Sequence, residues 1–227
     1  MTLEEAIAKI KPLDHNAMEI AQKRWDSIAK PLHSLGKLET LLIQIAGITG
    51  NAEVDLSRRG LIAMCADNGV VEEGVTQTGQ EVTAIVAENF LKYDTSVGVM
   101  CKQNHAEIFP VDMGMVTDTK VRTDHKIAYG TQNMTKGPAM TREQAVKGLE
   151  AGIDMVRELN DKGYRILATG EMGIGNTTTS SAVASVLLKQ PVEEMTGRGA
   201  GLTSEGLVRK INAIKKAIAL NLSLIHI

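Results

Sequence analysis

The chain has 227 residues, of which 43% are hydrophobic and 23% are charged, and its formal net charge at pH 7 is −2. This length and balance predict a globular protein of one large domain with a small addition, able to build its own hydrophobic core. With this net charge the chain has no basic patch to bind the phosphate backbone of a nucleic acid. Its aromatic content of 3% leaves no row of rings on which bases could stack, so nucleic acid is excluded as a partner.

Two cysteines, Cys65 and Cys101, are too few for a disulfide scaffold, and both lie in apolar segments where we expect buried, reduced thiols. The first residues, MTLEEAIAKI, alternate acids with apolar residues and lack the order of a secretory signal peptide. The sequence contains no apolar run of the length that a bilayer span needs. We therefore expect a cytoplasmic protein with no membrane partner.

The N-terminal quarter of the chain predicts helices, because its apolar residues recur at helical spacing and the segments KPLDH and KPLHS interrupt the pattern. We expect these helices to form a small helical subdomain over residues 1–55. The three predicted helices span residues 3–10, 16–29 and 35–50.

From residue 56 the pattern changes to short apolar runs, each followed downstream by a helical stretch. This alternation predicts an α/β domain over residues 56–227, a Rossmann-like, three-layer parallel sheet with helices on both faces. The predicted strands are 61–65, 106–111 and 165–169, and the predicted helices are 81–93, 141–160 and 177–188.

Each predicted strand is followed by an acid, one further residue and a glycine, the acids being Asp67, Asp112 and Glu171. Ligands of open α/β sheets bind outside the carboxyl ends of the strands, so the three carboxylates are expected to converge on one site. Acids after strands also make turns and caps, and we assign Asp112 to that role. A carboxylate-bound Mg²⁺ is an open alternative, but the scattered histidines exclude a zinc site, and we expect no metal and no cofactor.

Residues 164–181, YRILATGEMGIGNTTTSS, read as a strand, a glycine turn and a helix N-terminus, an arrangement that binds phosphate. Gly170, Gly173 and Gly175 allow close backbone approach, and Asn176 to Thr179 offer N-cap side chains. The spacing GxxGxG fits neither a dinucleotide fingerprint nor a Walker loop. The alternative is a glycine-rich turn that only caps a buried helix.

Two further segments suit ligand binding. The polar loop after Asp67 is long for a strand-to-helix connection and leads to Glu81, which either caps the next helix or faces the crevice. Residues 196–210, TGRGAGLTSEGLVRK, combine a glycine turn carrying Arg198 with a helix that bears Lys210. Backbone N–H groups and cations of this kind hold phosphates, although an arginine between glycines is also common in surface turns.

Four blocks in this order, RWDSIAKPLHSLGKLETL, ADNGVVEEGVTQTGQEVT, GEMGIGNTTTSSA and TGRGAGL, resemble the nicotinate-nucleotide:dimethylbenzimidazole phosphoribosyltransferases of cobalamin biosynthesis, over residues 24 to 210. The resemblance implies an enzyme that transfers the 5-phosphoribosyl group of nicotinate mononucleotide to 5,6-dimethylbenzimidazole. The products would be α-ribazole 5'-phosphate and nicotinate. It also implies small-molecule substrates and a homodimer.

The resemblance assigns roles residue by residue. Glu171 would be a supporting catalytic residue beside the ribose or the reacting base. The phosphate and ribosyl oxygens would be held by the glycine turn, and the phosphate would be neutralised by Lys210. The implied binding residues are Gly173, Ile174, Gly175, Asn176, Thr177, Arg198, Gly199 and Lys210, with Asp67, Gln77 and Glu81 bordering the base pocket.

The sequence departs from the family pattern at its end. The family's catalytic base lies in a late segment, GEGTGA, which has no counterpart here, and the final LSLIHI does not resemble the family's continuation. We therefore expect a C-terminally truncated fragment with an incomplete α/β domain. Open alternatives are a phosphoribosyl- or nucleotide-binding module without turnover and a purely structural α/β subunit, whereas the glycine spacing disfavours an NAD-dependent oxidoreductase.

Overall fold

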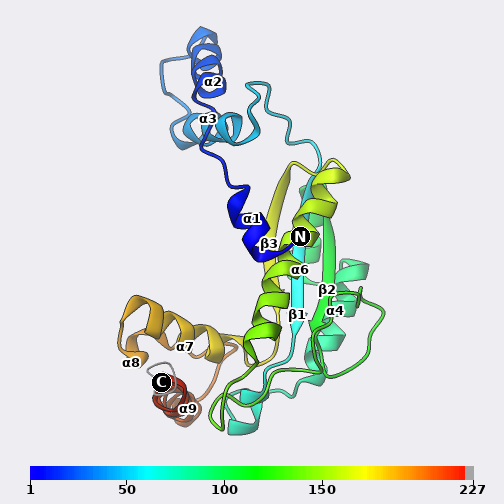
Figure 1. Cartoon of the computed structure of the whole chain (residues 1–227), viewed down its shortest axis with the longest axis vertical. Coiled ribbons are helices and arrows are strands. Elements are labelled where there is room, and N and C mark those ends of the chain that lie inside the picture. The colour runs from blue at the N-terminus through cyan, green and yellow to red at the C-terminus, as the bar shows by residue number, and fades with distance from the viewer. Residues whose placement is uncertain (223–227) are drawn as a thin grey trace.

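A computed structural model describes residues 1–222, so residues 223–227 of the LSLIHI tail lie outside the described residues. The centre of the protein is a three-stranded parallel sheet with the strand order β2-β1-β3 (Figure 1). Its strands are β1 (Arg59–Ala66), β2 (Ala106–Gly114) and β3 (Ile166–Met172). The parallel pairing confirms the predicted sheet and brings all three carboxyl ends to one edge.

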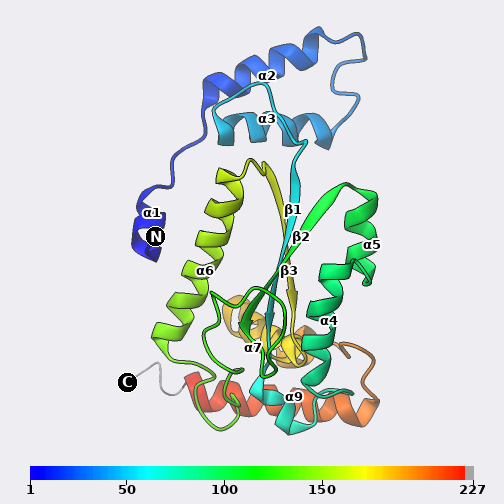
Figure 2. The same ribbon diagram turned by 90° about the vertical axis from the view of Figure 1, so that its right-hand side faces the viewer.

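Helices cover both faces of the sheet, as predicted (Figure 2). One face carries α4 (Glu81–Lys92) and α5 (Ser96–Gln103), and the other carries α6 (Arg142–Asp161). Helix α5 was not predicted from the sequence, and it is only eight residues long. The resulting three layers form the α/β body of the protein.

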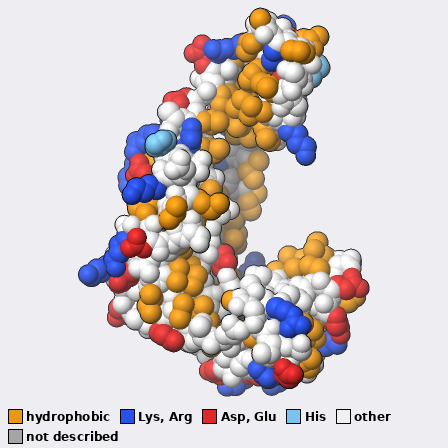
Figure 3. Space-filling view, turned by 180° about the vertical axis from the view of Figure 1, so that it is seen from behind, with side chains coloured by type: hydrophobic (Ala, Val, Ile, Leu, Met, Phe, Trp, Pro, Cys, Tyr) orange, Lys and Arg blue, Asp and Glu red, His pale blue; other side chains and the backbone are white. Residues whose placement is uncertain are grey.

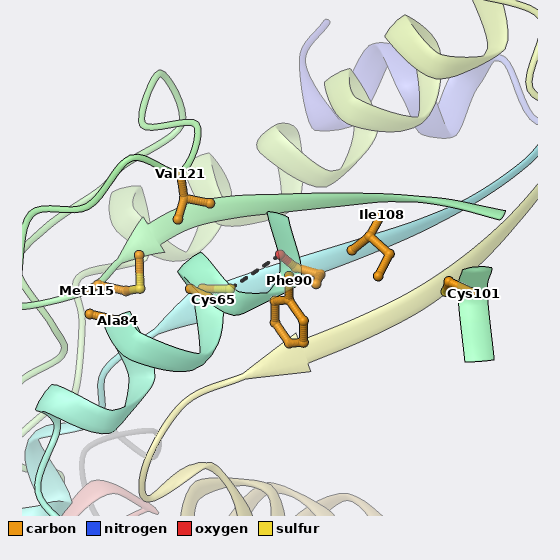
Figure 4. Packing of buried hydrophobic residues seen from close by; sticks show 9 residues of the cluster. Cys65, Ala84, Phe90, Cys101, Ile108, Met115 and Val121 are labelled. Carbon is orange, nitrogen blue, oxygen red and sulfur yellow. Dashed lines mark hydrogen bonds between the residues drawn. The ribbon is translucent and has the colours of Figure 1, made fainter. Parts of the chain in front are cut away.

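The core between the sheet and the α4–α5 layer contains both cysteines (Figure 4). Cys65 of β1 and Cys101 of α5 are buried and free, as expected. Burial raises the pKa of the Cys65 thiol to about 12. Phe90 and Met115 fill the space around them, and on the opposite face Met155 and Leu159 of α6 pack on the sheet.

A further helical layer lies beyond the carboxyl ends of the strands (Figures 1 and 2). It consists of α7 (Asn176–Leu188), the short α8 (Val192–Met195) and α9 (Ser204–Leu222), which pack on one another. The 3-10 helix η1 (Gly69–Glu73) follows β1 and contacts α9. The acids that follow the three strands predict a ligand in the space between the sheet edge and this layer.

The N-terminal helices are α1 (Leu3–Ala8), α2 (His15–Ser27) and α3 (Lys37–Thr49), close to the predicted ranges. The α2–α3 pair packs together at the end of the molecule opposite α7 and α9 (Figure 1). In contrast, α1 lies against α6, where the Leu3 backbone N–H donates to Glu150 Oε1 at 3.1 Å. The division of the chain at residue 55 stays a prediction, with α1 belonging by its contacts to the α/β body.

Hydrophobic side chains remain accessible on the side of β3, which is an edge strand of the sheet. Figure 3 shows the molecule hollowed between the α2–α3 pair and the α7–α9 layer, with hydrophobic side chains around the hollow. A groove of about 520 Å³ beside α6 is lined partly by Ile62, Met64 and Leu149. On α7, Val183 and Leu187 are 58% and 74% exposed.

Candidate functional site

The turn between β3 and α7 depends on two glycines. A Cβ on Gly173 would lie 2.1 Å from the carbonyl oxygen of Ala66, so no other residue fits there. Gly175 has a φ of +89° and forms the N-cap of α7, which begins at Asn176. Asn176 is therefore inside the helix rather than its cap. The two glycines let the chain turn from strand to helix directly at the end of β1.

A cavity of about 270 Å³ opens next to this turn, outside the carboxyl end of β3. Three segments form its wall, namely the β3–α7 turn, the loop at residues 75–78 and the glycine turn at residues 198–202, and α9 adds Lys210. The cavity brings together the following residues predicted for the site: Gln77, Gly173, Ile174, Gly175, Asn176, Thr177, Arg198, Gly199 and Lys210.

Lys210 is the main cation of the cavity, and only 1% of its surface is exposed to solvent. Its Nζ donates to Thr177 Oγ1 at 2.7 Å and to the Gly197 carbonyl at 3.1 Å. The ammonium group has no carboxylate partner within 4 Å in the part of the chain that the structure describes, and burial lowers its pKa. A buried ammonium without a counter-ion favours the binding of an anion.

Glu171 lies at the end of β3, exposed to solvent. Its Oε1 accepts a hydrogen bond of 2.5 Å from Asn176 Nδ2, and Asn176 Oδ1 accepts one of 2.7 Å from the Thr177 N–H. Through Asn176 the carboxylate is joined to the wall of the cavity. The site thus combines an ammonium group with a nearby carboxylate, which can act on two different parts of one ligand.

The glycine turn at residues 198–202 is held by its own polar groups. Arg198 donates to the Leu202 carbonyl at 2.8 Å and to Ser204 Oγ at 3.2 Å. Gln77 donates through Nε2 to the Gly201 carbonyl and so ties the loop after η1 to this turn. Arg198 therefore contributes to the shape of the cavity wall as well as to its positive charge.

The three strand-end carboxylates do not converge on the cavity, contrary to the sequence-based expectation. Asp112 is fully buried, and its Oδ1 accepts from the backbone N–H groups of Gly114 and Met115 at 2.9 and 2.7 Å. Its Oδ2 lies 3.1 Å from Lys126 Nζ. The turn role assigned to Asp112 is confirmed.

Asp67 is also fully buried and accepts a 2.8 Å hydrogen bond from the Val116 N–H, while burial raises its pKa above the ordinary value. Glu81 is the exposed first residue of α4. Neither residue lines the cavity, so their assignment to a base pocket stays a prediction. Among residues 1–222, no group of three or more His, Cys, Asp or Glu side chains is arranged to hold a metal ion.

Two residues that support the cavity wall were not predicted from the sequence. Asn68 and Thr83 each make a hydrogen bond to the backbone of Ile174, which lines the cavity. Asn68 was visible as the middle residue of an acid-x-glycine ending, but Thr83 lies on a helix 91 positions away from Ile174. No local pattern links residues so far apart.

A phosphoribosyltransferase family model matches residues 10–225. The chain belongs to this phosphoribosyltransferase family. It is 51% identical over 223 residues to the nicotinate-nucleotide–dimethylbenzimidazole phosphoribosyltransferase of Ruminiclostridium cellulolyticum, covering 97% of this chain and 63% of that protein. The enzyme of the same name from Clostridium tetani is 47% identical over 221 residues, covering 96% of this chain and 61% of its own length.

Solved structures agree with this membership. The crystal structure of CobT from Thermus thermophilus matches with a TM-score of 0.82 at 36% identity, covering 90% of this chain and 62% of that one. The chain thus spans a little under two thirds of the length of these relatives. None of its described helices has the length and apolar character required to cross a membrane.

The contact between Gly173 and Ala66 leads to a stability prediction. Gly173→Ala should lower the free energy of unfolding by about 2 kcal/mol or more, because the methyl group overlaps a backbone oxygen that cannot move without disturbing β1. Gly197→Ala is the matched control, since its added Cβ meets no atom within 4 Å. Urea unfolding of both variants measures the difference. Equal stability would contradict the close approach at Gly173.

Proposed function

We propose that this chain binds nicotinate mononucleotide and transfers its 5-phosphoribosyl group to 5,6-dimethylbenzimidazole, giving α-ribazole 5'-phosphate and nicotinate. The observation that carries the proposal is the cavity in which the GEMGIGNT turn meets Lys210, a buried cation without a carboxylate partner among the described residues. The names of the relatives in Ruminiclostridium cellulolyticum and Clostridium tetani support the choice of substrates.

We place the phosphate of nicotinate mononucleotide next to Lys210. Lys210 and the backbone of the Gly173–Thr177 turn offer a positive charge and the N-terminus of α7, which both attract a phosphate dianion. Arg198 adds a second positive charge on the opposite turn. In this orientation the ribose extends toward the end of β3, where Glu171 lies.

The chemistry occurs at the anomeric carbon of the ribose. The bond to the nicotinate nitrogen breaks with its electron pair going to nicotinate, the unprotonated nitrogen of the benzimidazole forms the new bond with its lone pair, and the other nitrogen gives up its proton. The oxocarbenium-like transition state is positively charged, so the Glu171 carboxylate stabilises it. The proton requires a general base, and Glu171 is the first candidate among residues 1–222 because Asn176 joins it to the cavity wall.

A second function has a specific observation in its favour. Asp67 and Asp112 are fully buried and bind backbone groups, so neither is free to take a proton from a substrate in the cavity. With Glu171 committed to the transition state, the chain would act as a phosphoribosyl-binding module without turnover. Binding and turnover therefore have to be measured separately.

We also propose that the protein works as a homodimer in the cytoplasm on small-molecule substrates. The exposed apolar residues of α7 and the groove beside α6 support an association with a second surface. The substrates named for the relatives are small and soluble, which supports a cytoplasmic location.

The function is tested by nicotinate release from nicotinate mononucleotide, measured with this chain beside the full-length Ruminiclostridium cellulolyticum enzyme. Release that requires added dimethylbenzimidazole supports the transferase, and Glu171→Gln should then lower kcat more than affinity. Tight nucleotide binding without release supports the binding module. Absence of both contradicts the two proposals.

Lys210→Met should weaken the binding of nicotinate mononucleotide about 10- to 100-fold, because a charge-assisted hydrogen bond contributes about 1.5–3 kcal/mol. Lys215→Met on the same helix is the control, since Lys215 is half exposed and pairs with Glu193 on the surface. Isothermal titration calorimetry measures both affinities. Unchanged affinity in Lys210→Met would remove the phosphate from this end of the cavity.

The affinity should also depend on pH in a defined direction. Burial lowers the pKa of Lys210 below its ordinary value of 10.5, so the ammonium loses its proton at a lower pH than a free lysine. The neutral amine no longer attracts a phosphate, and the affinity for nicotinate mononucleotide should fall as the pH rises through this lowered pKa. Titrations at increasing pH below 10.5 should show the fall in the natural chain and a flatter profile in Lys210→Met.

A further inference from the structure

Ile174, in the middle of the glycine turn, is held by side chains from two other elements. Asn68 Nδ2 donates to the Ile174 carbonyl at 3.1 Å. Thr83 Oγ1 accepts from the Ile174 N–H at 3.0 Å. Both polar groups of this one peptide residue are thus bound by residues that lie more than 90 positions earlier in the chain.

Asn68 has a defined orientation of its own. Its Oδ1 accepts from Thr179 Oγ1 at 3.3 Å, and its backbone carbonyl accepts from Gln80 Nε2 at 3.2 Å. Because the Ile174 carbonyl can only accept, the amide nitrogen of Asn68 must face it, and the amide oxygen then faces Thr179. The side chain therefore links the turn to the first residues of α7.

Thr83 is fully buried in α4. Its hydroxyl lowers the pKa of Asp67 by hydrogen bonding, although less than burial raises it, and Asp67 Oδ1 has no hydrogen-bond partner of good geometry among the described residues. The hydroxyl thus stands between the Asp67 carboxylate and the Ile174 N–H. An ionised Asp67 carboxylate can only accept a hydrogen bond, so the Thr83 hydroxyl donates its proton to Asp67. The Thr83 oxygen is then left to accept from the Ile174 N–H.

The turn needs this support because its own sequence does not select one backbone conformation. Ile174 lies between two glycines, and glycine reaches many backbone angles at little steric cost. A Cβ at either glycine would meet atoms of neighbouring segments, with Ala66 beside Gly173 and Val71 and Asn68 beside Gly175. The turn has a backbone hydrogen bond of its own, from the Asn176 N–H to the Gly173 carbonyl at 3.0 Å, and the two hydrogen bonds at Ile174 add support from outside the turn.

We propose that Asn68 and Thr83 are positioning residues that hold the Gly173–Gly175 turn in the conformation that accepts the phosphate group of the substrate. Neither side chain lines the cavity, so both act through Ile174. The role in substrate binding rests on the function proposed above. The apparent affinity of a ligand falls in proportion to the population of the binding-competent conformation, so a loosened turn binds more weakly without any lost contact to the ligand.

The test compares Thr83→Val, which keeps the shape and removes the hydroxyl, with Thr83→Ser, which keeps the hydroxyl. The first readout is hydrogen exchange of residues 172–177 in the protein without ligand. The second is the affinity for nicotinate mononucleotide by calorimetry. We expect faster exchange and about five- to tenfold weaker binding in Thr83→Val, with both values near those of the natural chain in Thr83→Ser.

Thr95→Val is the matched control. Thr95 Oγ1 also accepts a backbone N–H, that of Gly98 at 2.9 Å, but at the start of α5, and it does not line the cavity. This variant should lose stability while exchange at residues 172–177 and nucleotide affinity stay unchanged. Asn68→Asp, which replaces the donor facing Ile174 with an oxygen, should behave like Thr83→Val.

The two readouts separate the proposals. If the natural chain does not bind nicotinate mononucleotide, the function proposed above fails, and the exchange data still decide whether Thr83 holds the turn. Exchange in Thr83→Val equal to that of the natural chain would overturn the positioning role. So would faster exchange together with unchanged affinity in a chain that binds the nucleotide, or a failure of Thr83→Ser to restore both values.

Discussion

The carboxyl edge of the sheet depends on how the central strand ends. The carbonyl of Ala66, the last residue of β1, limits how close the β3–α7 turn can come. The next residue, Asp67, holds the loop that follows β2 through the Val116 N–H. Asn68 then binds Ile174. Three consecutive residues at the end of β1 thus set the position of the β3–α7 turn and of the loop that follows β2. They can do so because β1 is the central strand and has a neighbour on each side.

The buried charges at this edge of the sheet have two different roles, because the acids hold loops in place and the lysine attracts a ligand. Two acids, Asp67 and Asp112, are buried where backbone N–H groups bind one oxygen of each and Lys126 lies beside Asp112, which holds the loops in place. Lys210 is buried without a carboxylate partner among residues 1–222, and burial of a charge is unfavourable unless an opposite charge arrives. The Lys210 ammonium is therefore already removed from water before a ligand binds, so the free energy of desolvating it is spent during folding. This is typical of sites that are formed in advance of their ligand.

Much of the fold could be predicted from the sequence, because hydrophobic periodicity reports which face of an element is buried. The strands and long helices follow from it, whereas α5 and α8, with eight and four residues, contain too few turns for a pattern. The site was predictable where glycines lie close in sequence, as at Gly173. Asp67, Asp112 and Glu171 share one local context, and only loop packing decides that two are buried and the third exposed. The support from Thr83 likewise arises from the fold.

The two cysteines offer a way to observe how the α/β body opens. Cys65 lies in the central strand and Cys101 in α5, and both are closed off within the same core. The high pKa of Cys65 keeps its sulfur protonated at neutral pH, so the folded chain presents no thiolate there to an alkylating reagent. Labelling of Cys65 by such a reagent would count openings of the central strand, whereas earlier labelling of Cys101 would report detachment of α5 alone.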